Sequence, residues 1–174
     1  SVSFTPVGLR AFVGVPAAEL TEQVVDAALV DRRLRNAVAR IGSAPPDSRR
    51  SALLLESLAE LCRPPDDPGF VLAGHVVSAL RTAPDRPAVA GVVEEVGIGE
   101  RMLQRLFAEY VGLSPKAMSI VARINRAASL LAGSAPLTDV AHAVGFYDHP
   151  QFARTFRKAT GYTPREFRSL HRVR

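Results

Sequence analysis

An internal repeat in the C-terminal half of the chain is the feature that most constrains its fold. Three pairs of short stretches match: "RLF" at 105–107 with "RTF" at 154–156, "GLSP" at 112–115 with "GYTP" at 161–164, and "VG" at 96–97 with "VG" at 144–145. The first two pairs are offset by 49 residues and the third by 48, so the second copy has one extra residue in its turn. Two copies cannot form a solenoid, which needs about three repeats to bury its faces. They instead predict two matched modules on one scaffold.

Each copy contains the parts of a helix-turn-helix. A short apolar segment ends at a glycine, which can take the left-handed conformation that closes a helix. A short turn follows, and a second helical pattern then places apolar side chains on one face. These inward positions are Leu103, Leu106 and Phe107 in the first copy and Phe152 and Phe156 in the second. We therefore expect helix-turn-helix motifs over about 88–110 and 137–160.

Each motif is followed by a hydroxyl residue and a proline, the order of an N-cap and a first helical residue. In the second copy, Thr163 and Glu166 also match a capping box. From Pro115 a helical pattern continues for about 18 residues, or about 27 Å at 1.5 Å per residue. As a rigid spacer it would set two recognition helices roughly 34 Å apart, one turn of duplex, so that one chain covers about 20 base pairs.

The outward faces of the second helices suit DNA recognition. In a helix-turn-helix, the second helix enters the major groove and its N-terminal outward residues reach base edges. Arg can bond bidentately to guanine, and Gln to adenine. The predicted base contacts are Arg101, Gln104, Arg105, His149, Gln151 and Arg154. For His149, simple solvent exposure stays an equally open alternative.

Phosphate contacts are predicted where a helix in the groove approaches the DNA backbone. Arg157 and Lys158 lie one turn beyond the base-contact positions, and Lys116 lies at the start of the joining helix. The charge distribution agrees with this prediction. Residues 88–174 carry 12 Lys and Arg against 7 Asp and Glu, whereas residues 1–87 carry 10 of each. The basic half is the expected footprint of a polyanionic partner.

Several other classes of protein are disfavoured. The single cysteine, Cys62, allows neither a disulfide framework nor a multi-cysteine zinc site, and we expect a buried structural thiol. No apolar run approaches the roughly 18 residues of a membrane span, and no leader opens the chain, so we expect a soluble, cytoplasmic protein. The motifs assemble no nucleophile with its base and no phosphate-binding loop. We therefore predict no enzymatic activity, no metal and no cofactor.

The first half of the chain mixes a short β pattern with helices. Residues 1–16 are β-branched and aromatic residues broken by glycine and proline, which predicts a short strand or two. Helical patterns follow over 31–42 and 47–62, the second with Asp47 or Ser48 as its N-cap. Their apolar faces consist of Leu34, Val38 and Ile41, and of Leu54, Leu55, Leu58, Leu61 and Cys62.

The predicted fold is mainly α, with two helix-turn-helix subdomains joined by a long linker helix and preceded by a helical hairpin and a short β segment. The stiff "RPPDDPG" stretch at 63–69 is the best domain boundary, and it separates domains 1–66 and 67–174. The leucines of residues 53–61 form either the core of the hairpin or a dimer seam, and both interpretations stay open.

Residues from about 67 to 172, which include both copies and the linker helix, resemble the DNA-binding domain of the AraC/XylS family of bacterial transcription regulators. The most specific match consists of Gly145, Phe146, Phe152, Arg154, Phe156, Gly161, Pro164, Phe167 and Arg168, together with Arg126 and Ala127 of the linker helix. Two positions depart from the family pattern. Gly99 replaces the usual Ser or Thr N-cap, and Pro150 occupies a position that is often polar, which puts one base contact of the second motif in doubt.

The resemblance implies a regulator that binds double-stranded promoter DNA, activates transcription and touches RNA polymerase. Residues 1–66 are less specifically similar to the end of a sensor domain, which implies homodimerisation through residues 29–62 and a chain that is a fragment of a longer protein. No small-molecule effector site is expected in this chain alone. The alternative is a protein-binding adaptor with the same fold, whose binding would not weaken steeply with salt as DNA binding does.

Overall fold

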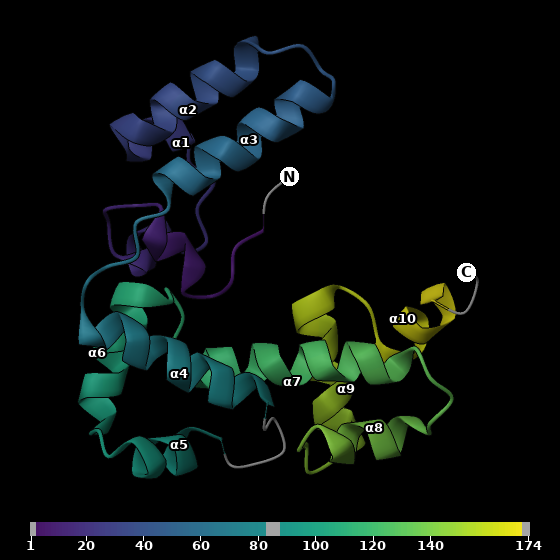
Figure 1. The fold of residues 1–174 in the computed structure, drawn as a ribbon. Helices are drawn as coiled ribbons and strands as arrows, with labels where there is room; N and C mark the ends of the chain where they lie inside the picture. Colours follow the sequence, from purple (N-terminus) through teal and green to yellow (C-terminus); the bar gives the residue numbers. More distant parts are fainter. Residues whose placement is uncertain (1–2, 83–87, 172–174) are drawn as a thin grey trace. The chain divides into compact units, whose positions relative to one another are not determined.

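The computed structural model describes residues 3–82 and 88–171, and these residues form ten α-helices, two short 3-10 turns and no strand (Figure 1). The 3-10 turns are η1 (Gly8–Ala11) and η2 (Ala17–Leu20). The helices are α1 (Ala27–Val30), α2 (Arg32–Ser43), α3 (Ser48–Leu61), α4 (Pro68–Thr82), α5 (Ala88–Val96), α6 (Glu100–Tyr110), α7 (Pro115–Leu131), α8 (Leu137–Ala143), α9 (His149–Thr160) and α10 (Pro164–His171). No helix of these residues is both long and apolar enough to cross a membrane. The mainly helical prediction is confirmed.

The predicted β segment at residues 1–16 is wrong over the part that the structure describes. From Ser3 onward this stretch contains the 3-10 turn η1 and no strand, and η2 follows directly. A strand needs a partner edge, and proline cannot donate to one. The segment instead buries Ala11, Val13 and Ala17 by side-chain packing. Residues 1–2, and residue 172 at the end of the family match, lie outside the described residues.

Contacts divide the chain into two compact units, one of residues 1–74 with 101–114 and the other of residues 75–100 with 115–174. Within the first unit, α2 and α3 pack side by side as the predicted hairpin (Figure 1). Asp31 and Asp47 cap these helices by accepting from the N–H groups of Arg33 and Arg49 at 2.7 and 2.8 Å. These units are groups of contacting residues and do not test the predicted domains 1–66 and 67–174, which stay a prediction.

The hairpin buries less apolar surface than its sequence predicts. Leu61 is buried, but Val38 and Leu55 are 47% and 68% exposed. The prediction of a buried Cys62 thiol is wrong, because this residue is exposed. Helix α3 ends at Leu61, and Cys62 is its C-cap with an extended backbone (φ −65°, ψ 107°), so the side chain leaves the helical face that the pattern assigned to it.

The second unit has a core between α7, α8, α9 and α10 (Figure 1). The residues of this core are Ile124, Ala127, Leu131, Val140, Ala141, Val144, Phe146, Phe152 and Phe156. Neighbouring rings of Phe146, Phe152, Phe156 and Phe167 meet at inclined or edge-on angles, with centroids 5.3–5.6 Å apart. The predicted capping box before α10 is confirmed, since Thr163 Oγ1 accepts from the N–H of Glu166 while the Glu166 carboxylate accepts from the N–H of Thr163.

Candidate nucleic-acid interface

The first candidate recognition helix, α6, has an apolar face and a polar face. Leu103, Leu106, Phe107 and Tyr110 are buried. Arg101, Gln104 and Arg105 are exposed. Because residues three and four apart share a helix face, these three form one outward surface in the first turns of the helix. The inward positions are therefore as predicted, and the outward side chains are accessible.

The second candidate recognition helix, α9, is fixed at its start and its end. Asp148 is its N-cap, and its Oδ1 accepts from the N–H of Gln151 at 2.6 Å. Pro150 lies in the first turn, where its missing N–H costs no helical hydrogen bond. Gly161 closes the helix in the left-handed conformation, with φ +82°. Four repeat glycines have positive φ, and they are Gly97, Gly112, Gly145 and Gly161.

The outward face of α9 matches the prediction except at His149. Gln151, Arg154, Arg157 and Lys158 are exposed, whereas Phe152 and Phe156 are fully buried. His149 is half-buried, and its ring meets that of Phe152 edge-on with centroids 6.3 Å apart. This packing makes His149 the least accessible of the six predicted base contacts.

Two accessible residues of this surface were not predicted. Tyr147 directly precedes the N-cap of α9 and is 90% exposed. Arg165 is exposed in the first turn of α10 and follows Lys116 by 49 residues, so the repeat alone makes it the second-copy counterpart of that predicted phosphate contact. Lys116 is also exposed. The repeat offset of 49 residues is enough to predict Arg165 as a phosphate contact from the sequence. No sequence pattern predicts a role for Tyr147.

A groove lies beside the C-terminal end of α9. It encloses about 830 Å³ and is lined by Arg157, Gly161, Tyr162, Arg165, Glu166, Ser169 and Leu170. The hydrogen bonds from Thr163 and, to a smaller extent, the charge of Arg157 lower the pKa of Glu166, so this carboxylate is ionised and engaged in the cap. Arg157 and Arg165 both line this groove, and their positive charges can attract phosphates.

The turn that leads into α9 is held from the linker helix α7. Arg123 Nε donates to the Val144 carbonyl oxygen at 2.6 Å, and the guanidinium lies 4.0 Å from the centroid of the Phe146 ring. Burial lowers the pKa of Arg123 below its usual value. Arg123 of the linker helix therefore holds the turn between α8 and α9 through its contacts with Val144 and Phe146.

α6 is held at its C-terminal end by residues of the first unit. Tyr110 donates a hydrogen bond to Asp67, and the ring of Phe70 meets that of Tyr110 edge-on. The bond to Asp67 raises the pKa of Tyr110 to about 12 and lowers that of Asp67. Arg10 forms an ion pair with Glu109 at 2.8 Å.

No group of three or more His, Cys, Asp or Glu side chains in the described part of the chain is arranged to hold a metal ion. The exposed arginine, lysine and glutamine side chains of α6 and α9 supply hydrogen-bond donors and positive charges on convex helix faces. Such faces fit the major groove of DNA.

Comparison with known proteins also indicates a DNA-binding helix-turn-helix protein. A family model described as a helix-turn-helix domain matches residues 92–169. The arabinose operon regulatory protein of Salmonella typhimurium is 34% identical over 122 residues, which are 70% of this chain and 42% of that protein. The F1 operon positive regulatory protein of Yersinia pestis is 41% identical over 75 residues, 42% of this chain and 25% of that protein.

Similarity extends to solved structures. The crystal structure of a transcriptional regulator from Chromobacterium violaceum, described as an AraC-type DNA-binding domain-containing protein, superimposes with a TM-score of 0.55 at 30% identity, covering 58% of this chain and 92% of that one. The chain spans less than half the length of both curated relatives above.

Fold, helix-turn-helix order and these matches define a DNA-binding transcription regulator of the helix-turn-helix class. The chain belongs to the AraC family of such regulators.

Proposed function

We propose that this regulator reads a bipartite operator, with α6 and α9 in two successive major-groove segments, and that it activates transcription. The observation that carries the proposal is the matched polar face of the two helices. Both α6 and α9 expose Arg and Gln in their first turns above an apolar face that packs inward. One regulator similar to this chain is named as a positive regulator, which supports activation.

The base contacts are assigned to the accessible residues. Arg101, Gln104 and Arg105 act from α6, and Gln151 and Arg154 act from α9, with His149 as a contact only if its ring leaves Phe152. Tyr147 joins them at the entry to α9. Arg157, Lys158 and Lys116 neutralise phosphates, which fixes the register of the helices without reading sequence.

The proposed partners beyond DNA are RNA polymerase and a second copy of the chain. Promoter binding places the regulator in the bacterial cytoplasm beside the polymerase. The dimer uses residues 29–62, where Leu29, Val38 and Leu55 are 79%, 47% and 68% exposed. These exposed apolar side chains lie on α1, α2 and α3, and large exposed apolar side chains support an interaction surface there.

The test is selection of bound duplexes from a random pool at near-physiological salt, followed by sequencing. Two enriched blocks about ten base pairs apart, centre to centre, are expected for two recognition helices on one face of the duplex. Arg105→Ala and Arg154→Ala should each relax preference in one block. Arg49→Ala is the matched control, because Arg49 is exposed on the hairpin helix α3.

The competing function is a protein-binding adaptor with the same fold. No enrichment, with weak binding to all duplexes, would contradict specific DNA recognition and favour the adaptor. One enriched block would contradict bipartite recognition. Pro150 would then point to α9 as the helix that does not read bases.

A further inference from the structure

The two recognition helices are supported in different ways. α9 packs within the core of its own repeat, against α7, α8 and α10. Residues Arg101–Ser114, which hold nearly all of α6, instead group with residues 1–74 in the first compact unit. The matched repeat gives no reason for this difference, so the supporting contacts of α6 must come from the N-terminal segment and the start of α4.

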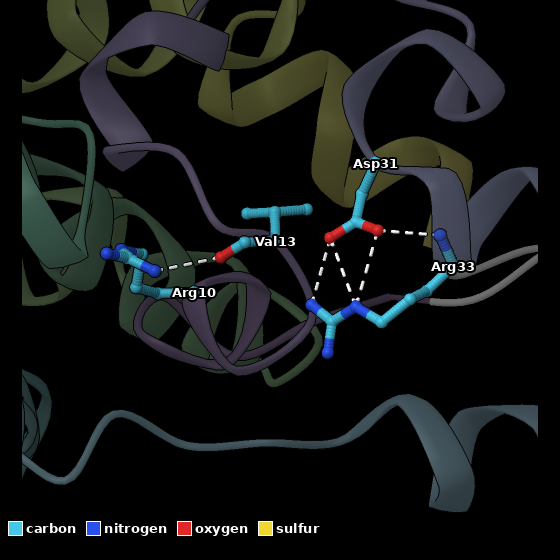
Figure 2. A network of polar contacts seen from close by, with 4 residues as sticks. All are labelled: Arg10, Val13, Asp31 and Arg33. Carbon is cyan, nitrogen blue, oxygen red and sulfur yellow. Dashed lines mark hydrogen bonds and ion pairs between the residues drawn. The ribbon is translucent and has the colours of Figure 1, made fainter.

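Arg10 is the first of these contacts. Its Nε and Nη2 both donate to Glu109 Oε1, at 3.2 and 2.8 Å, across 99 residues of sequence. Its Nη1 donates to the Val13 carbonyl oxygen at 2.8 Å (Figure 2). The side chains of Arg10 and Glu109 are 18% and 33% exposed. A guanidinium held at all three nitrogens in a partly buried position has a fixed geometry, which the usual exposed ion pair lacks.

Thr21 is the second contact. Its Oγ1 donates at 2.7 Å to the carbonyl oxygen of Gly112, two residues after the end of α6. A Cβ added to Gly112 would lie 2.8 Å from the Ala17 carbonyl oxygen, so the N-terminal segment is in close contact with this turn. The repeat supplies an internal control. At Gly161, the equivalent glycine after α9, an added Cβ would meet nothing within 4 Å.

We propose that residues 4–21 form a control segment that positions α6, with Arg10 and Thr21 as positioning residues, so that the first recognition helix depends on the N-terminal segment and the second does not. Loss of the contacts between this segment and α6 then alters recognition of one operator block and leaves the other unchanged. This inference rests on the proposed bipartite recognition of DNA.

The experiment is a charge swap across the ion pair. Arg10→Glu places two carboxylates together, Glu109→Arg places two cations together, and the double variant Arg10→Glu/Glu109→Arg restores attraction. Each protein is tested on the selected duplex and on duplexes with either block scrambled. The ratio of affinities for intact and scrambled duplexes measures discrimination in that block and cancels any general change in charge.

Each single variant should lose about fivefold or more of the discrimination in the α6 block, a typical coupling between sites, and keep wild-type discrimination in the α9 block. The double variant should recover most of the loss. The control is Glu19→Arg, a charge reversal at an exposed residue of the same segment, which should change neither block. Equal losses in both blocks, or no recovery in the double variant, would overturn the inference.

A second measurement needs no DNA and separates this inference from the proposed function. Hydrogen exchange should be several-fold faster at the amides of α6 in Arg10→Glu and in Thr21→Val, with α9 unchanged. Thr21→Ser keeps the hydroxyl and should exchange like the wild type. Unchanged exchange at α6 would overturn the positioning role even if the wild type binds its operator. If the wild type selects no operator while α6 loosens as expected, only bipartite DNA recognition is wrong.

Discussion

Arg123 is the residue through which the linker helix holds the entry to the second recognition helix. Its bond to the Val144 carbonyl oxygen satisfies a backbone group in a buried turn, and its stacking on Phe146 adds a cation–π contact. Neither contact has an acidic partner. Both contacts therefore depend on the planar shape and fixed donors of the arginine side chain as much as on its charge.

Arg123→Met, which keeps most of the aliphatic length, should lower the free energy of unfolding by about 1–3 kcal/mol, because the Val144 carbonyl loses its donor in a buried turn. Arg126→Met is the matched control, since Arg126 is exposed on the same helix and should change stability by about 0.5 kcal/mol or less. Urea unfolding of the two variants checks this. Equal effects would mean that the contacts of Arg123 add nothing.

The bond between Tyr110 and Asp67 makes stability depend on pH at both ends of the scale. The pKa of Tyr110 is raised to about 12, so its contribution is full below the unfolded value of about 10 and is lost as pH rises toward 12. The pKa of Asp67 is lowered, so its contribution is full above the unfolded value of about 4 and is lost as pH falls through the lowered one.

Tyr110→Phe removes this bond and keeps the ring against Phe70. The difference in free energy of unfolding between wild type and Tyr110→Phe should therefore be widest between about pH 4 and pH 10 and should shrink above pH 10. Denaturation of both proteins across this range measures it. A difference that stays constant up to about pH 12 would show that the hydroxyl does not donate to Asp67.

At the scale of elements, α6 and α9 are each followed by a left-handed glycine, Gly112 or Gly161, but the two glycines have different surroundings. Gly161→Ala should cost about 1–2 kcal/mol, the usual cost of a left-handed alanine, because the site is otherwise open. Gly112→Ala should cost clearly more, since its methyl group also meets the Ala17 carbonyl oxygen at 2.8 Å. Thermal or urea unfolding compares the pair. Equal costs would show that the N-terminal segment does not press on Gly112 in solution.

The elements also show what the sequence could predict. The helix-turn-helix pairs, the caps at Asp47 and Thr163 and the inward phenylalanines depend on residues a few positions apart, so local pattern was enough. The prediction of a β segment was wrong because a strand needs a distant partner. The prediction of a buried Cys62 was wrong because α3 ends before this residue, so its side chain leaves the apolar face of the helix. The contact of Arg10 with Glu109 spans 99 residues, and no local pattern contains it.

At the scale of the whole molecule, we propose two classes of exposed residue, those that read bases and those that only neutralise phosphates. The positive balance lies in residues 88–174, with 12 Lys and Arg against 7 Asp and Glu. Affinity for any duplex should therefore fall steeply with salt, because each neutralised phosphate releases counterions. Preference between sequences should depend instead on the few side chains at the starts of α6 and α9.

Lys158→Ala and Arg165→Ala should weaken binding to all duplexes about equally and should each reduce the slope of log affinity against log salt by about 1, the effect of one lost phosphate contact. Arg105→Ala should instead cost about 1–3 kcal/mol on the selected operator and relax preference at one base pair, with less effect on scrambled DNA. Binding titrations at four salt concentrations, on selected and scrambled duplexes, separate the two classes. If Arg105→Ala weakened every duplex evenly, α6 would hold the backbone rather than read the groove, and sequence recognition would have to come from α9 alone.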